Sequence, residues 1–148
     1  MKIEGYFDPD FKHPAPFVDA IIISEDAGIM HKVSFLIDTG ASMTILLDKD
    51  VKDIGLDVGR LEKAEKQLGG IGGSVETYLV KDARVVFESD EGFYEQGLLL
   101  YVGLHDLTGA DEKTIKRILV IPSLLGREIF GKFDLYCFPG KAKLYLEC

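Results

Sequence analysis

One short run of the chain places an acidic residue between two strongly apolar segments. Residues 35–46 read Phe-Leu-Ile-Asp-Thr-Gly-Ala-Ser-Met-Thr-Ile-Leu. Apolar runs bounded by turn residues are typical of buried strands. The Thr-Gly pair after Asp38 predicts a tight turn, so the carboxyl group lies close to the core, where ionisation is costly unless other groups compensate. The segment therefore predicts a strand–turn–strand unit with an acid at its turn.

Glycines and other turn residues interrupt the remaining sequence at short intervals. The runs between them are rich in Val, Ile, Leu, Phe and Tyr, a pattern that predicts an all-β barrel or sandwich. Residues 24–28, Ser-Glu-Asp-Ala-Gly, predict a hairpin turn between two such strands. The predicted strands cover residues 2–7, 17–23, 30–37, 43–46, 75–88, 93–102, 117–121, 133–138 and 142–147.

Helices are expected to be few and short. Asp48 is placed to cap a helix through Ile54 that Gly55 ends. A second short helix is expected over residues 127–133, and Asp111 is placed to cap a third helical turn through Lys116. Two groups of acids are interpreted as solvated surface groups: Asp8 and Asp10, and Asp48, Asp50 and Asp53.

Length and composition limit the classes of protein. The 148 residues are enough for one domain, residues 1–148, with its own core. A net charge of −8 argues against nucleic acid and anionic membranes as partners. The apolar runs are far shorter than the roughly 20 residues of a membrane span. The first residues lack the apolar core of a signal peptide, so the expected location is the cytosol.

Cysteines and histidines give no sign of a disulfide framework or a metal site. The cysteines are Cys137 and Cys148. A hairpin turning near residues 139–140 would set Cys137 opposite a residue near 143, so two reduced thiols are expected, while a bridge across a dimer axis stays open. The histidines lack the spacing of a metal site, so no metal is predicted: they are His13, His31 and His105.

The Asp-Thr-Gly motif occurs once in the chain. Hydrolysis of a peptide by carboxyl groups needs a base that activates water and an acid that protonates the leaving group, and two neighbouring carboxyls that share one proton fill both roles. Because one chain supplies one such acid, the second has to come from another copy. The axis of a twofold dimer places each residue near its own copy, so the motif count predicts a homodimer.

Three segments in order carry a resemblance to a known family. Residues 35–46 resemble the active-site loop of aspartic proteases. Residues 67–74, Gln-Leu-Gly-Gly-Ile-Gly-Gly-Ser, are similar to the flap hairpin of retroviral-type enzymes, and residues 124–130, Leu-Leu-Gly-Arg-Glu-Ile-Phe, to their second hallmark. The chain thus resembles the retropepsin-like aspartic proteases, in their cellular, single-domain, homodimeric form. The resemblance implies a closed, barrel-like, all-β acid protease fold with a flap hairpin and one or two short helices.

The resemblance also implies roles for particular residues. It makes the chain an aspartic endopeptidase acting on peptides or unfolded proteins, without metal or organic cofactor. One departure is Ser42, since many retroviral enzymes carry there an acid that pairs with the residue matching Arg127. The implied catalytic residues are Asp38, Thr39 and Gly40, with Thr39 bonding across the dimer, and the implied substrate-binding residues are Ala41, Gly70, Ile71, Gly72 and Gly73.

Two alternative interpretations remain open, and the C-terminal residues differ from the pattern of the retroviral enzymes. The chain could be a non-catalytic dimeric module that binds peptides or dimerises and keeps the fold. The glycine-rich residues 69–73 could form a plain surface loop. Residues 133–148 predict a hairpin, which we expect to supply most of the dimer interface, with the N-terminal strand less involved.

Overall fold

A computed structural model describes residues 1–65 and 75–148, in which strands dominate and helices are short. The strands are β1 (Lys2–Glu4), β2 (Tyr6–Asp8), β3 (Ala15–Ser24), β4 (Ile29–Ile37), β5 (Ile45–Leu46), β6 (Glu62–Lys63), β7 (Val75–Ser89), β8 (Gly92–His105), β9 (Leu124–Leu125), β10 (Asp134–Phe138) and β11 (Lys143–Glu147). The helices are α1 (Asp48–Ile54), α2 (Glu112–Ile118) and α3 (Arg127–Phe130), with 3-10 turns over Val58–Arg60 and Pro139–Lys141.

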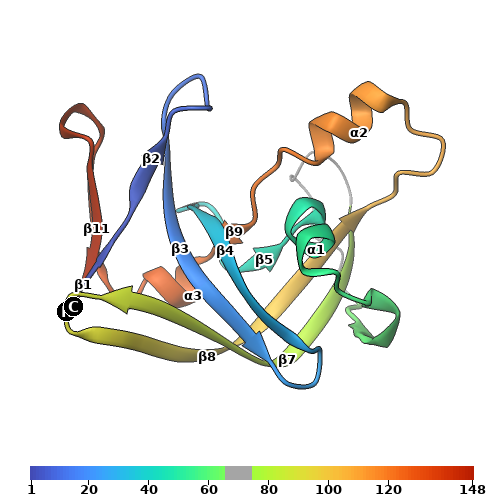
Figure 1. Ribbon diagram of the computed structural model, residues 1–148, viewed down its shortest axis with the longest axis horizontal. Helices are drawn as coiled ribbons and strands as arrows, with labels where there is room; N and C mark the ends of the chain where they lie inside the picture. The colour runs from blue at the N-terminus through green and yellow to red at the C-terminus, as the bar shows by residue number, and fades with distance from the viewer. Residues whose placement is uncertain (66–74) are drawn as a thin grey trace.

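The strands form one large sheet and one small one (Figure 1). The large sheet has the order β2-β3-β4-β9-β5-β8-β7-β6, and the small sheet the order β1-β11-β10. β3 also pairs with β7, so the large sheet curves back on itself and closes a ring of strands. The strands of this ring therefore have neighbours on both sides, whereas β2 and β6 end the large sheet. The predicted all-β architecture with few short helices is therefore confirmed.

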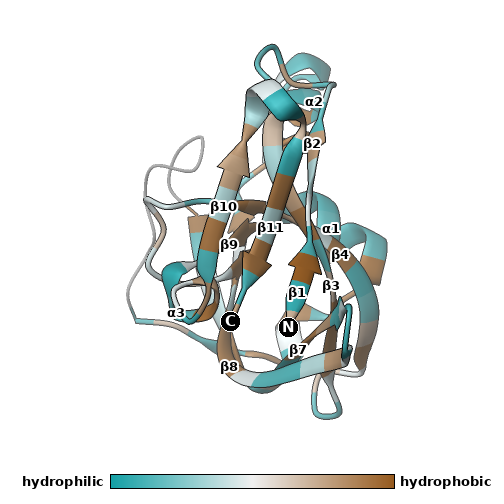
Figure 2. Cartoon of the chain, turned by 90° about the vertical axis from the view of Figure 1, so that its left-hand side faces the viewer, coloured by the Kyte–Doolittle hydropathy of each residue, from teal (hydrophilic) through white to brown (hydrophobic). Residues whose placement is uncertain are grey.

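Alternate residues of the long strands build the core. Along β3, Val18, Ala20 and Ile22 are buried, while the residues between them are more exposed. β4 repeats the pattern with Val33 and Phe35. Successive side chains of a strand point to opposite faces, so this alternation directs one face of each strand inward. The same alternation appears as changing hydropathy along the strands in Figure 2.

Two strand predictions fail for identifiable reasons. The predicted strand over residues 117–121 is wrong, because α2 extends to Ile118. Asp111 caps this helix as predicted, its carboxylate accepting the Thr114 N–H at 2.8 Å, and the helix continues into the apolar run. The predicted strand over residues 2–7 is divided at Gly5, where a Cβ atom would lie 2.6 Å from the Phe17 carbonyl oxygen.

Helix α1 has the predicted bounds but not the predicted cap. Gly55 ends it with φ +71°, a conformation that favours glycine. The N-cap residue is Leu47, without a side-chain hydrogen bond, so the prediction that Asp48 caps the helix is wrong. The interpretation of Asp48 and Asp50 as solvated acids is also wrong, because each is only 7% exposed.

The chain ends meet in the small sheet. β10 and β11 form the predicted hairpin, and β1 adds to its other side. The N-terminal ammonium of Met1 donates to the Cys148 carbonyl at 3.0 Å, and the two ends lie side by side in Figure 1. Cys137 lies opposite Leu144, and both cysteines are free and exposed.

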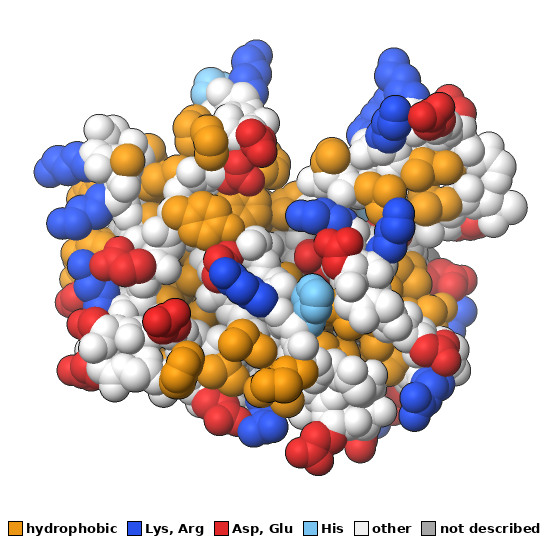
Figure 3. Space-filling model, in the orientation of Figure 1, with side chains coloured by type: hydrophobic (Ala, Val, Ile, Leu, Met, Phe, Trp, Pro, Cys, Tyr) orange, Lys and Arg blue, Asp and Glu red, His pale blue; other side chains and the backbone are white. Residues whose placement is uncertain are grey.

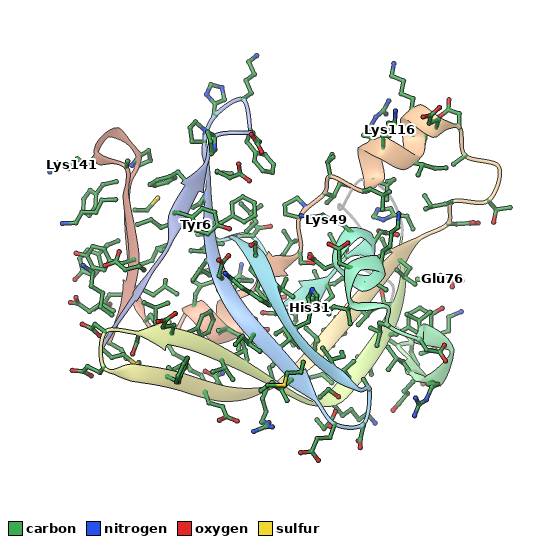
Figure 4. The ribbon with its side chains drawn as sticks, viewed as in Figure 1. Tyr6, His31, Lys49, Glu76, Lys116 and Lys141 are labelled. Atoms are coloured by element: carbon green, nitrogen blue, oxygen red, sulfur yellow. The ribbon has the colours of Figure 1, made fainter. Side chains whose placement is uncertain are left out.

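Two parts of the chain project from the body on the side opposite the β3–β4 turn. They are the connection between β2 and β3 and the segment around α2, and a hollow separates them in the space-filling view (Figure 3). Lys116 on α2 points away from the body (Figure 4). None of the helices within residues 1–65 and 75–148 has the length and apolar character needed to cross a membrane.

A carboxylate fixes the β3–β4 turn to β7. Asp82, at an irregularity of β7 between Val80 and Ala83, accepts the Ser24 hydroxyl at 2.5 Å and the Asp26 N–H at 3.0 Å. These two donors hold the pKa of Asp82 below its ordinary value of 3.8. A lowered pKa in the folded state stabilises the protein above the unfolded pKa, and this stabilisation is lost as the pH falls through the folded value.

Asp82→Asn is expected to lower the free energy of unfolding by about 1–2 kcal/mol at pH 7, because one of the two donors loses its acceptor. The difference from the parent chain should shrink as the pH falls from the ordinary carboxyl pKa of 3.8 through the lower pKa of folded Asp82, because the parent carboxylate is then protonated as well. Urea unfolding at pH 7 and pH 3 measures both values. An equal difference at the two pH values would contradict this role of the carboxylate.

Candidate active site

The two hallmark segments are the Asp38 segment, residues 35–46, and the second hallmark, residues 124–130. They leave the large sheet side by side. β4 and β9 are parallel, with Leu36 opposite Leu124 and Ile37 opposite Leu125. Asp38 follows β4 directly, and its N–H donates to the Leu125 carbonyl at 3.4 Å. Because parallel strands end at the same edge of a sheet, the Asp38 loop and the glycine-arginine turn after β9 start from neighbouring points.

The Asp38 loop is closed by its own backbone. The Ala41 N–H donates to the Asp38 carbonyl oxygen at 3.1 Å, and the Gly40 N–H donates to Asp38 Oδ1 at 2.9 Å. A Cβ atom on Gly40 would lie 3.2 Å from that carboxylate oxygen, so a side chain would crowd it. Asp38 is half-buried, whereas Thr39 and Gly40 are exposed. The turn therefore orients the carboxyl group while the loop tip stays accessible.

The second hallmark binds the first through the backbone. The Arg127 N–H donates to the Ala41 carbonyl at 3.0 Å, and the Glu128 N–H donates to the Ser42 carbonyl at 3.3 Å. Arg127 Nη1 also donates to the Thr39 carbonyl at 2.7 Å. The arginine thus supports the Asp38 loop directly, and it does so without an acid at residue 42.

The buried Thr44 and the partly buried Glu128 complete this contact, and the sequence prediction missed both. Thr44 is fully buried, and its hydroxyl accepts the Gly126 N–H at 2.9 Å. Its own N–H donates to Glu128 Oε1 at 2.6 Å. The only local signal was a threonine inside an apolar run and an acid in a short helix. Both roles depend on a partner about eighty positions away, which local pattern does not reveal.

Glu128→Ala is expected to lower the free energy of unfolding by about 1–3 kcal/mol, because the buried Thr44 N–H loses its acceptor. Glu128→Gln keeps an amide oxygen for that N–H and should cost less. Thermal or urea unfolding of both variants makes the comparison. Equal losses for alanine and glutamine would show that the Thr44 contact is not what Glu128 contributes.

Asp50 of α1 makes a buried hydrogen bond to the segment that leads into β9. Asp50 Oδ2 accepts the Ser123 hydroxyl at 2.5 Å, and the Ser123 oxygen accepts the Leu47 N–H at 3.0 Å. The Ser123 carbonyl accepts the Leu36 N–H at 2.9 Å. One serine therefore joins α1 to the ends of β4 and β9. Buried carboxylates need such partners, which explains why Asp50 tolerates its position.

Asp48 makes a second buried connection, to the end of β8. Its carboxylate contacts His105 Nδ1 at 2.5 Å and accepts the His105 N–H at 3.0 Å. Both side chains are almost fully buried. Within the described residues, no three or more His, Cys, Asp or Glu side chains form a group that could hold a metal ion.

The structure brings together half of the residues singled out from the sequence. Asp38, Thr39, Gly40 and Ala41 form one loop. The predicted flap residues Gly70, Ile71, Gly72 and Gly73 lie outside the described residues, so their role stays a prediction. The strands that precede and follow this segment, β6 and β7, pair antiparallel.

Comparisons with known proteins agree with this geometry. Residues 23–89 match the family model described as aspartyl protease, a range that contains the whole Asp38 loop. Over these residues, which are a little less than half of the chain, the sequence resembles the aspartyl proteases. The match supports an aspartic-type peptidase. The second hallmark lies beyond the matched range but is hydrogen-bonded to the loop inside it.

One solved structure extends the likeness to the whole fold. The crystal structure of a retropepsin-like aspartic protease from Rickettsia conorii is 20% identical, covers 99% of this chain and 89% of its own, and has a TM-score of 0.58. EIAV protease complexed with the inhibitor HBY-793 is 19% identical, covers 80% of this chain and 86% of its own, and has a TM-score of 0.45. No curated protein matches the sequence.

Proposed function

We propose that this chain, as one domain of residues 1–148, is a homodimeric aspartic endopeptidase whose water is activated by two Asp38 carboxyls, one from each subunit. The observation that carries the proposal is the single Asp38 loop, fixed by Gly126 and Arg127 and accessible at its tip. A carboxyl group that is held in place at an accessible turn can react with a bound peptide. Peptide hydrolysis needs two such carboxyls, and one chain supplies one of them.

The reaction follows from one proton shared between the two carboxyls. The ionised carboxyl takes a proton from water as the oxygen attacks the peptide carbonyl, and the protonated one stabilises the developing oxyanion. Proton transfer to the amide nitrogen then allows the C–N bond to break, and the carboxyl pair returns to its starting state. The carboxyl pair itself activates the water, so the mechanism needs no metal.

The remaining sequence-derived roles belong to the same proposal. Thr39 braces the loop across the dimer, and Gly40 and Ala41 allow the substrate backbone to approach the carboxyls. Gly70, Ile71, Gly72 and Gly73 cover the substrate and exclude water. The proposed substrates are peptides or unfolded proteins, and the proposed location is the cytosol.

Cleavage of a reduced and alkylated unfolded protein tests the proposal. We expect peptide products at acid to mildly acid pH and loss of activity at higher pH, because raising the pH removes the shared proton. EDTA should have no effect. Binding of the unfolded protein without any cleavage from acid to neutral pH would favour the non-catalytic module instead.

A further inference from the structure

Three strands, β1, β3 and β7, enclose a space in which their edges do not pair with one another. β3 and β7 are paired as far as Ile21 and Val86 and then separate. β1 reaches the end of β7, close to the chain termini (Figure 1). There the Asp90 N–H donates to the Lys2 carbonyl at 3.0 Å, and the Lys2 N–H donates to Asp90 Oδ1 at 2.7 Å.

Hydrogen bonds around β3 show which of its backbone groups face this space. In an antiparallel pair, every second residue directs both its N–H and its C=O toward the same neighbour. The Leu36 and Asp38 N–H groups donate to the β9 segment, so the odd-numbered residues of β4 face β3, where they are opposite even-numbered residues. The odd-numbered residues of β3 therefore face away from β4. Of these, Phe17 pairs with β2 and Ile21 with β7, while Asp19 lies between the two pairings.

The same alternation applies to the other two strands. Val86 pairs with β3, so Glu88, two residues further along β7, directs its backbone groups to the same side. In β1, the Met1 carbonyl and the Gly5 N–H both bond toward β11 and the C-terminal residue. Glu4 therefore faces away from β11. One residue from each of the three strands thus directs its N–H and C=O into the enclosed space.

No regular pairing satisfies all three of these residues. Continued by two residues, the β3–β7 register would match Asp19 with Glu88, and the β2–β3 register would match Asp19 with Glu4. The contact of Lys2 with Asp90 would likewise match Glu4 with Glu88. Each residue can form this pair of bonds with one neighbour, so the three matches conflict. The cavity between the strands, which we call the junction cavity, has a volume of about 460 Å³.

The charges around the junction cavity favour a cation. Its lining includes four carboxylates and two lysines: Glu4, Asp19, Glu88, Asp90, Lys2 and Lys32. Each lysine forms an ion pair with one carboxylate, Lys2 with Glu4 and Lys32 with Asp19, both at 3.1 Å. Within residues 1–65 and 75–148, Glu88 has no ion pair, and these acids do not form a group that could hold a metal ion. An organic cation therefore suits the excess negative charge.

One wall of the junction cavity is apolar. It includes the half-buried Ile21 and Val86 and the Phe93 ring, which is 74% exposed. Phe93 is directly opposite Glu88 in the β7–β8 pair, so their side chains lie on the same face of the sheet. An aromatic ring beside a carboxylate suits a side chain that has an apolar stem and a charged end, as lysine and arginine have.

We propose that the junction cavity binds a short, extended peptide segment that carries a lysine or arginine side chain. An extended residue offers its N–H and C=O on one side, as a neighbouring strand does, and can pair with Asp19. Its basic side chain then lies along Phe93, with the cation at Glu88. The cavity volume of about 460 Å³ is within the roughly 300–1,000 Å³ of ligand sites.

This site is separate from the Asp38 loop and goes beyond the proposed function. Asp19 is opposite Ser34 of β4, and Asp38 follows four residues later. At about 3.3 Å per residue, this separation is about 13 Å along the strand. Binding at the junction cavity needs neither the Asp38 carboxyl nor a second chain.

Titration of a ¹⁵N-labelled Asp38→Asn chain with acetyl-Ala-Lys-Ala-amide, followed by NMR, tests the proposal without cleavage of the peptide. We expect saturable shifts of the Glu4, Asp19 and Glu88 amide signals. The same peptide with norleucine in place of lysine keeps the alkyl chain but lacks the charge. It should bind about tenfold more weakly, because a hydrogen bond to a charged group is lost.

Substitutions in the same background test the two walls of the cavity. Glu88→Gln should weaken binding of the lysine peptide about tenfold and remove its preference over the norleucine peptide. Phe93→Ala should weaken both peptides. Glu25→Gln is the matched control, since Glu25 is an exposed acid on the β3–β4 turn that does not line the cavity. Circular dichroism should show all variants folded.

Each outcome decides the proposal. Shifts at the junction cavity that depend on Glu88 and on the lysine charge would support it. Shifts confined to residues 38–41 would place the peptide at the Asp38 loop alone and overturn the second site, as would the absence of shifts at millimolar peptide. Equal affinity for the two peptides, or an unchanged affinity in Glu88→Gln, would overturn the assignment of a basic ligand.

Discussion

Asp38→Asn is expected to reduce the turnover of an unfolded protein by about 10²–10⁴-fold, the usual contribution of a general acid or base. Asparagine keeps the size of the side chain and an oxygen for the Gly40 N–H, which Asp38 Oδ1 accepts at 2.9 Å. The loop should therefore keep its shape while it loses the ionisable group. Turnover is measured on one substrate, and circular dichroism and unfolding check the fold.

Asp57 provides a matched control for this substitution. Its Oδ1 accepts the Gly59 N–H at 3.1 Å, so it forms the same aspartate-x-glycine turn as Asp38, but at an exposed position away from both hallmark segments. Asp57→Asn should leave turnover unchanged. Full activity of Asp38→Asn, or an equal loss in both variants, would remove Asp38 from the catalytic centre.

Gly126→Ala is expected to have the second largest effect. A Cβ atom there would fall against the Met43 carbonyl carbon and Glu128 Oε2, and 2.7 Å from the Met43 Cα. Main-chain atoms cannot move aside without displacing the Asp38 loop. We expect a loss of about 1–3 kcal/mol in the free energy of unfolding, as for other overpacked sites. Turnover should fall further than this loss alone explains, because the Asp38 carboxyl is displaced.

Gly97→Ala makes the matching control. A Cβ atom on Gly97 would meet no atom closer than the Ala83 carbonyl oxygen at 4.0 Å. Alanine there should be neutral or slightly stabilising, since it reduces the conformations of the unfolded chain. If Gly126→Ala were as stable and active as Gly97→Ala, the close packing of the two hallmark segments would not matter to the site.

The sequence predicted those parts of the fold whose information is local. Each correctly predicted feature depends on residues that are close together in the sequence. These features are the alternation along β3 and β4, the end of α1 at Gly55 and the helix cap at Asp111. The Asp38 loop was predicted from its motif for the same reason. Residues 117–121 failed because a short apolar run fits a strand and the end of a helix equally well.

The supports of the site could not be predicted, because they depend on distant partners. From the sequence alone, Asp48 and Asp50 resemble surface acids. In the structure, Asp50 is hydrogen-bonded to Ser123 and Asp48 contacts His105. The hydrogen bond from Arg127 to the Thr39 carbonyl likewise cannot be predicted from the sequence around either residue. Long-range hydrogen bonds of this kind decide which polar residues are buried, and only the assembled fold shows them.

Mixing the parent chain with the Asp38→Asn chain tests most directly whether the catalytic unit is shared between two subunits. A mixed dimer holds one carboxyl and one amide, so it cannot share a proton between two acids and should be nearly inactive. With equal amounts and free exchange, about one dimer in four contains two parent chains. Activity per parent chain should then fall to about half of its unmixed value at constant dimer occupancy. Activity per parent chain that stays unchanged, with subunit exchange demonstrated, would mean that each chain works alone and would contradict the shared carboxyl pair.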